Sequence, residues 1–214
     1  VCPKTALTSV RDINFDPFAY GDLKIIYFIN CYVSPYWETV YNHHLNDIAA
    51  SGLADYPQCE IKIVANCKPS ELTRIAKIAK NNFESKLKRK NNDDKLMGCK
   101  YEITWSKEEF YEYPGVKLVY KSAQAANRND YIIYAHAKGL SHLVGAASKC
   151  PNDSCMASKM ILKNSLNNID ILNIIPSLNK IGPGLGGSGW MLFDFYLSRA
   201  SYIKRLDSPV CTTD

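Results

Sequence analysis

The feature that most constrains the fold is an alternation of short, continuously apolar segments with longer segments of helical periodicity. The clearest apolar segments are LKIIYFINCYV from Leu23, EIKIVANC from Glu60 and YIIYAH from Tyr131. Segments that are apolar at successive positions are typical of strands covered on both faces. Strands that alternate with helices therefore predict an α/β, Rossmann-like fold, in which an open, mostly parallel central sheet carries helices on both faces.

Helical patterns follow the first two apolar segments. In the first pattern Ser34 can cap the helix, Pro35 fits its first turn, and apolar residues recur at helical spacing until Gly52. The second pattern, PSELTRIAKIAKNNF, begins with Ser70 as its cap. Each of these strands is thus predicted to lead into a helix that returns the chain to the start of the next strand.

The rest of the chain supplies further elements of both kinds. A shorter strand is predicted at residues 100–105, and the tripeptide YPG at residues 113–115 interrupts the chain before a helix predicted at residues 116–127. Residues 154–175 predict one long helix. The segment GPGLGGSGWMLFDFYLSRASYIKRL then predicts a glycine-rich loop, an aromatic strand and a short final helix, starting at residue 182.

Composition narrows the class of protein. With 214 residues and 46% hydrophobic content, the chain is expected to form a single domain, 1–214, either by itself or excised from a longer polypeptide. A net charge of +5 is too small to predict nucleic-acid binding, and the densest basic run, residues 86–95, is interpreted as a solvated loop. No window approaches the roughly 20 apolar residues of a membrane span. We therefore expect a cytoplasmic protein whose eight cysteines are reduced.

Polar side chains follow three of the predicted strands at the points where they end. Asn30 and Tyr32 end the first strand, Asn66 ends the second, and His136 and Lys138 end the strand that begins at Tyr131. Ligands of open α/β sheets bind at the carboxyl ends of the strands, where the strand order reverses. We expect these residues to converge on one cleft and to bind a nucleotide.

Three segments carry a resemblance to a known family. They are the first strand-helix-strand, the sequence VKLVYKSAQAANRNDYIIYAHAKG, and the late GGSGWMLFDFYLSRASYIKRL. From about Leu23 to Leu206 the chain resembles nucleotide-sugar glycosyltransferases of the GT-A fold, particularly the virus-encoded kind that glycosylates a chlorovirus capsid protein. The resemblance implies a UDP-sugar donor, a glycan or glycoprotein acceptor, a divalent metal such as Mn or Mg in many members and, for a viral enzyme, the host cytoplasm.

One departure from the family bears on the metal. GT-A enzymes usually end this strand in Asp-x-Asp, whose carboxylates hold the metal, whereas this chain has His136-Ala137-Lys138. A leaving diphosphate needs a cation, which a metal or Lys138 can supply. His136 can bind a metal as a neutral imidazole or donate to phosphate as an imidazolium. Metal dependence therefore stays open, as does the alternative that both side chains only face solvent.

Other candidate residues flank this strand or come later in the chain. Lys121 and Arg128 can reach donor phosphate or ribose, or can be solvated charges. The resemblance implies that Gly187, Ser188 and Trp190 contact the acceptor or the transferred sugar.

Asp194 lies inside an aromatic segment that predicts a buried strand. A buried carboxylate is costly unless it is paired, binds a metal or shifts its pKa. Arg199 or Lys204 would make it a structural ion pair, whereas exposure to the cleft would make it the catalytic residue that holds the acceptor, acts as its base or stabilises the cationic sugar. His44, on the apolar face of its helix, is predicted to be a hydrogen-bonded core histidine.

Two functional classes besides a glycosyltransferase stay open from the sequence. The missing Asp-x-Asp also fits a non-catalytic nucleotide-sugar or carbohydrate-binding domain on the same fold. A different Rossmann-like enzyme, such as a methyltransferase, is disfavoured because no glycine-rich turn follows the first strand. The sequence decides neither the sugar nor whether the reaction inverts or retains the anomeric configuration.

Overall fold

The computed structural model describes residues 21–30, 37–53, 58–87, 89–90, 96–97, 100–106, 112–136, 156–183 and 195–210. These residues form an α/β fold around a six-stranded sheet with the strand order β5-β2-β1-β6-β8-β7. The strands of the sheet are β1 (Leu23–Asn30), β2 (Cys59–Asn66), β5 (Lys100–Ser106), β6 (Tyr131–His136), β7 (Lys180–Ile181) and β8 (Tyr196–Arg199).

The sheet is mostly parallel, as predicted. β1 pairs in parallel with β2 on one side and with β6 on the other, and β2 pairs in parallel with β5. β8 then runs antiparallel to β6, and β7 antiparallel to β8. The chain therefore builds outwards from β1 through β2 to β5 and then crosses back to the other side of β1, so the strand order reverses between β1 and β6.

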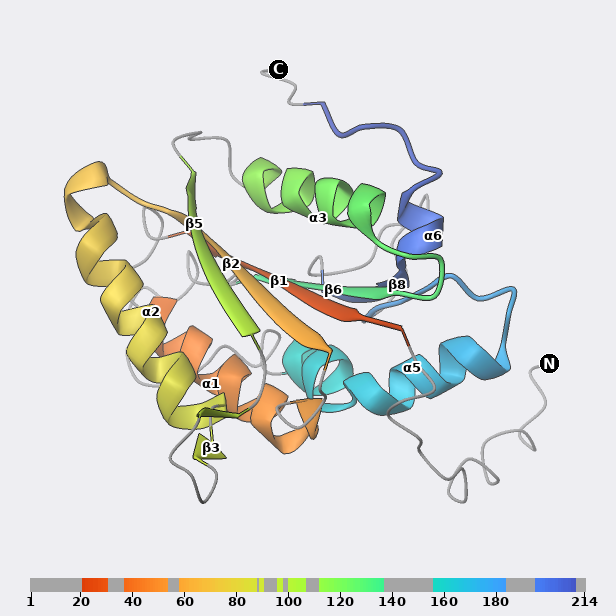
Figure 1. Cartoon of the computed structure of the whole chain (residues 1–214), viewed down its shortest axis with the longest axis horizontal. Helices are drawn as coiled ribbons and strands as arrows, with labels where there is room; N and C mark the ends of the chain where they lie inside the picture. Colours follow the sequence, from red (N-terminus) through yellow and green to blue (C-terminus); the bar gives the residue numbers. More distant parts are fainter. Residues whose placement is uncertain are drawn as a thin grey trace.

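Helices cover both faces of the sheet (Figure 1). In Figure 1, α1, α2 and α5 lie on one face, and α3 and α6 lie on the other. A hydrophobic core lies on each face of the sheet, and alternate residues of β1 belong to the two cores. Ile25 and Tyr27 pack with the first group of helices, and Ile26 packs with the second. The helices are α1 (Trp37–Ala50), α2 (Leu72–Leu87), α3 (Tyr113–Ala125), α5 (Ser165–Ile174) and α6 (Ala200–Ile203).

Several predicted boundaries are wrong. The YPG tripeptide does not interrupt the chain, because residues 113–115 form the first turn of α3, where a proline needs no hydrogen-bond donor. The predicted long helix is broken: a π-helical turn, Lys159–Lys163, precedes α5. The basic run predicted as a loop, residues 86–95, begins inside α2 and includes β3 (Arg89–Lys90), which pairs antiparallel with β4 (Leu96–Met97) just after the run.

Asp130 links the amino ends of β1 and β6 through hydrogen bonds. Its buried carboxylate accepts hydrogen bonds from the backbone N–H of Asp22, at 3.1 Å, and of Asn127, at 2.7 Å. Gly21 packs so closely here that an added Cβ would lie 2.5 Å from the backbone oxygen of Asn129. The hydrogen bonds of Asp130 and the close packing of Gly21 hold β1 beside β6 and therefore also position the carboxyl ends of both strands.

Candidate functional site

The candidate site lies at the carboxyl ends of β2, β1 and β6. In the register of the sheet Asn30 stands opposite Asn66, and Phe28 stands opposite His136. The reversal of strand order between β1 and β6 makes this edge the position at which open α/β sheets bind their ligands. The backbones of three strand ends thus meet here, as the sequence predicted.

His136 is the best-defined polar group at this edge. Its side chain is only 2% exposed, and its Nδ1 lies 3.7 Å from Oε1 of Glu112, the residue immediately before α3. The imidazole also packs against the rings of Tyr134 and Phe195, with centroid distances of 5.9 and 5.3 Å. His136 therefore does not simply face solvent, which was one of the two interpretations of the sequence.

Glu112 gives His136 a partner whose effect depends on the charge of the ring. A protonated His136 forms an ion pair with the carboxylate. A neutral His136 has only a weak contact, because 3.7 Å exceeds the usual hydrogen-bond distance. Because β6 ends and α3 begins at this edge, the pair brings the helix N-terminus next to the strand end.

A second histidine lies deeper in the structure and is a core residue, as predicted. His44 is fully buried, and its Nδ1 shares a 2.6 Å hydrogen bond with the hydroxyl of Tyr27. Its ring contacts Phe195, which in turn contacts His136. Phe195 thus separates the core histidine from the histidine at the strand end, and it forms an apolar wall of the candidate site.

Asn66 at the end of β2 is the most unusual polar group of the site. Its side chain is 2% exposed, yet its Oδ1 has no hydrogen-bond partner among the described residues. Buried polar atoms without a partner are rare and are usually satisfied by a water molecule or a ligand. The adjacent backbone is fixed, because Nε1 of Trp105 donates a 3.2 Å hydrogen bond to the carbonyl of Cys67.

Cys67, which follows Asn66, has no chemical role that its environment supports. Burial, with a smaller contribution from Glu71, raises the pKa of its thiol. Because the thiolate is the nucleophilic form, a raised pKa keeps this side chain unreactive at neutral pH. Cys67 and Cys59 are buried free thiols, and the reduced state of all eight cysteines stays a prediction.

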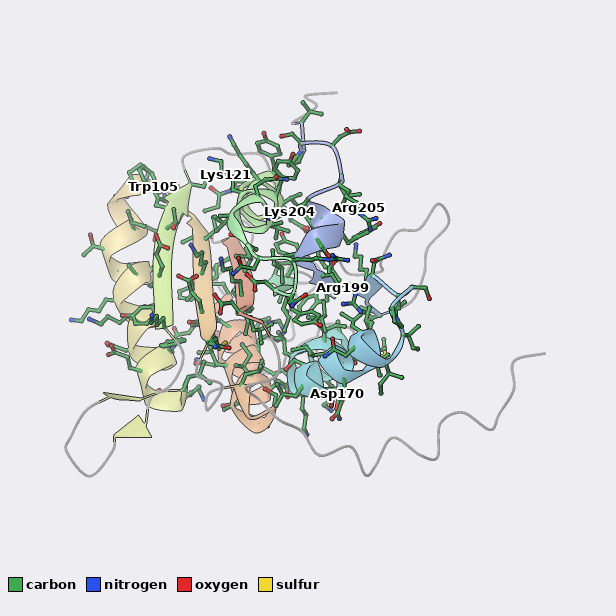
Figure 2. The ribbon with its side chains drawn as sticks, turned by 45° about the vertical axis from the view of Figure 1, so that its right-hand side comes forward. Trp105, Lys121, Asp170, Arg199, Lys204 and Arg205 are labelled. Atoms are coloured by element: carbon green, nitrogen blue, oxygen red, sulfur yellow. The ribbon has the colours of Figure 1, made fainter. Side chains whose placement is uncertain are left out.

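One predicted donor-binding residue, Arg128, is not brought to this edge. Arg128 lies in the turn before β6, at the amino edge of the sheet, so six strand residues, or about 20 Å, separate it from the carboxyl edge. Lys121 is exposed in the second half of α3. Figure 2 shows Trp105, at the carboxyl end of β5, on the opposite side of the molecule from Arg199, which ends β8.

Several predicted site residues lie outside the described part of the chain. The backbone of Asn30 is described as the last residue of β1, but its side chain is not. The others are Tyr32, Lys138, Gly187, Ser188, Trp190 and Asp194. The two structural partners considered for Asp194 make other contacts: Arg199 donates to the backbone oxygens of Leu172 and Leu178, and Lys204 donates to that of Ala126.

The divalent metal that the resemblance implies would need ligands among the side chains at this edge. His136 and Glu112 offer one nitrogen and one carboxylate. In the described part of the chain no three His, Cys, Asp or Glu side chains come together as metal ligands. Mg²⁺ and Mn²⁺ prefer several oxygen ligands, so this pair alone does not make a site that fits them.

Sequence reasoning missed Glu112 and Phe195. Glu112 precedes a helix that starts at the carboxyl edge, and an acidic residue at such a helix start is a signal that could have identified it. Phe195 directly precedes β8, whose antiparallel pairing with β6 places it beside the strand end. That pairing has no visible signature in the sequence.

Comparisons with known proteins identify no relative. Neither the known protein families nor the curated protein sequences contain a match to this chain. Among the described residues, none of the helices is both long enough and apolar enough to span a membrane. The class of protein is thus defined by the α/β fold and by the site at the carboxyl edge of its sheet.

Proposed function

We propose that this chain is a nucleotide-sugar glycosyltransferase of the GT-A fold, which transfers a sugar from a nucleoside diphosphate, UDP by preference, to a glycan or glycoprotein acceptor. The observation that carries the proposal is the pair of buried His136 and partly exposed Glu112 beside the reversal of strand order. The resemblance of the chain to these enzymes, including the virus-encoded kind, supports it. A mostly parallel α/β sheet alone would serve many other functions.

The donor occupies the carboxyl edge between β2 and β6 in this proposal. Asn66 offers a buried amide with an unsatisfied oxygen, which suits an N–H donor such as the imide of a uracil base. His136, oriented by Glu112, lies towards the diphosphate, and Lys138 supplies a cation for the developing charge on the leaving group. Tyr32 and the backbone at Asn30 complete the nucleotide side of the site.

Sugar transfer needs a carboxylate near the anomeric carbon, and Asp194 is the residue that we assign to it. The bond between the anomeric carbon and the diphosphate breaks through an oxocarbenium-like transition state, and the acceptor hydroxyl forms the new bond and loses its proton. Asp194 accepts that proton if the reaction inverts the configuration, or stabilises the cationic sugar if it retains it. Gly187, Ser188 and Trp190 lie beside it in sequence and contact the acceptor or the sugar.

Calorimetric titration with UDP, GDP and CMP, with and without manganese, tests the donor site. We expect UDP to bind best, and Asn66→Leu, which removes the buried amide while keeping its approximate volume, to weaken UDP binding by about tenfold. The matched control is Asn46→Leu, since Asn46 is exposed on α1. Binding of none of the three nucleotides would refute the proposal.

A non-catalytic nucleotide-sugar or carbohydrate-binding domain is the second candidate. The observation that favours it is the sequence His136-Ala137-Lys138 in place of Asp-x-Asp. The two candidates differ in turnover. Release of UDP from UDP-sugars, measured with glycan acceptors and with water alone, supports the transferase, whereas tight UDP-sugar binding without release supports the binding domain.

A further inference from the structure

A broad depression lies at the amino edge of the sheet, on the opposite side from the proposed donor site. It has a volume of about 870 Å³, and its lining includes Arg128, Asn129, Asn179, Arg199, Ser201 and Arg205. Three guanidinium groups thus come from three different places in the fold: the turn before β6, the end of β8 and the segment after α6. Figure 2 shows Arg199 and Arg205 together on this side of the molecule.

The positive charge of this depression is not neutralised by the described residues that line it, because none of them is a carboxylate. Arg128 and Arg205 are exposed, and neither forms a salt bridge with a described residue. Two buried acids belong to nearby elements: Asp130 already accepts two backbone hydrogen bonds, and Asp170 on α5, like Arg199, acts on the pKa of Tyr131. Like charges that converge without counterions repel one another, so an anion that enters the depression relieves this repulsion.

One of the three arginines is held rigidly. Nε of Arg199 donates a 3.1 Å hydrogen bond to the carbonyl of Leu178, and the same guanidinium donates to the carbonyl of Leu172. Arg199 therefore contributes a fixed charge to the depression, while the side-chain N–H groups of Arg128 and Arg205 can bind a ligand. Asn129, Asn179 and Ser201 add neutral hydrogen-bonding groups around them.

We propose that this depression is a binding site for a compact anion that carries two or more phosphate groups. Arginine donors that converge from three elements suit tetrahedral phosphate groups, each of which accepts hydrogen bonds from several directions. A planar carboxylate instead pairs with one guanidinium through two parallel hydrogen bonds. A protein partner fits less well, because the centres of protein interfaces are apolar and Pro176 is the only apolar side chain among the described lining residues. The site is independent of the proposed donor site, from which the length of β6 separates it.

The probe is inorganic pyrophosphate, titrated calorimetrically at low ionic strength without UDP, because UDP itself carries two phosphate groups and would compete at the amino edge. Lys138→Ala, in the proposed donor site, separates any pyrophosphate bound there from the pyrophosphate bound at the amino edge. We expect one pyrophosphate to bind, and Arg128→Gln and Arg205→Gln each to weaken it by about tenfold or more, the range for hydrogen bonds to charged groups. Lys80→Gln is the matched control, because Lys80 is an exposed cation on α2.

The outcomes separate this site from the donor site. Loss of pyrophosphate binding in both arginine variants but not in Lys138→Ala, with the melting temperature unchanged, supports the proposal. If the chain binds no UDP, the proposed function fails, while the pyrophosphate titration still tests the amino edge. The proposal is refuted if pyrophosphate does not bind, if the arginine variants bind it like the wild type, if Lys80→Gln weakens it equally, or if citrate binds as tightly through the same arginines.

Discussion

The pairing of His136 with Glu112 makes a quantitative prediction that a double-mutant cycle can test. Two unit charges at the observed 3.7 Å attract each other by about 4.5 kcal/mol at an effective dielectric constant of about 20, and by about 1 kcal/mol in water. Glu112 is 26% exposed, so water screens part of the attraction. We therefore expect a coupling free energy of about 1 to 2 kcal/mol when His136 is protonated.

The cycle compares the wild type, Glu112→Gln, His136→Gln and the double variant by urea unfolding at pH 5.5 and pH 8.5. An ion pair requires a protonated ring, and lower pH favours that form, so we expect the coupling to be larger at pH 5.5 than at pH 8.5. The cost of replacing the buried histidine cancels in the cycle, because His136→Gln is measured both with Glu112 present and in the Glu112→Gln background. A coupling below about 0.3 kcal/mol at pH 5.5, or one that is equal at both pH values, would refute the assigned ion pair.

Three further predictions follow from other parts of the chain. Gly21→Ala should lower the free energy of unfolding by about 1 to 3 kcal/mol, because the new methyl group would lie 2.5 Å from the backbone oxygen of Asn129; unchanged urea unfolding would show that this close approach does not exist. Lys138→Ala should weaken UDP binding by about 1.5 to 3 kcal/mol and leave uridine binding nearly unchanged, whereas an equal loss for both in calorimetry would mean that Lys138 does not contact the phosphates. Asp194→Asn should keep the melting temperature and donor binding but lower the rate of sugar transfer by about a hundredfold or more, and full activity would exclude its catalytic role.

The main strands could be predicted from the sequence because burial on both faces requires apolar residues at successive positions. All six residues of β6 are buried, and the segment from Tyr131 is correspondingly apolar until its final histidine. β7 has only two residues and exists through its pairing with β8, so no local pattern reveals it. Local propensity likewise does not distinguish a proline that breaks a helix from one that begins it, which is why the start of α3 was misplaced.

The break in the predicted long helix directly follows a contact with a residue far away in the sequence. The hydroxyl of Ser158 donates a 2.6 Å hydrogen bond to Asp47 on α1, and both side chains are buried. The π-helical turn begins at the next residue, and Met160 within it is 42% exposed. Helical periodicity records which residues are apolar, but it does not record a polar contact between residues 111 positions apart.

The same limitation applies to the candidate site. His136 could be identified because a polar residue ends an apolar strand, but its partner lies 24 residues earlier, and only the packing of α3 against the sheet brings the two together.

Arg128 shows the opposite case. It stands eight positions before His136 and is a candidate, from the sequence, for contact with donor phosphate or ribose, whereas an extended strand places the two residues at opposite edges of the sheet. The geometry of β6 thus assigns these neighbours in sequence to two different sites, and because the length of the strand separates them, substitutions at one edge should leave binding at the other edge unchanged.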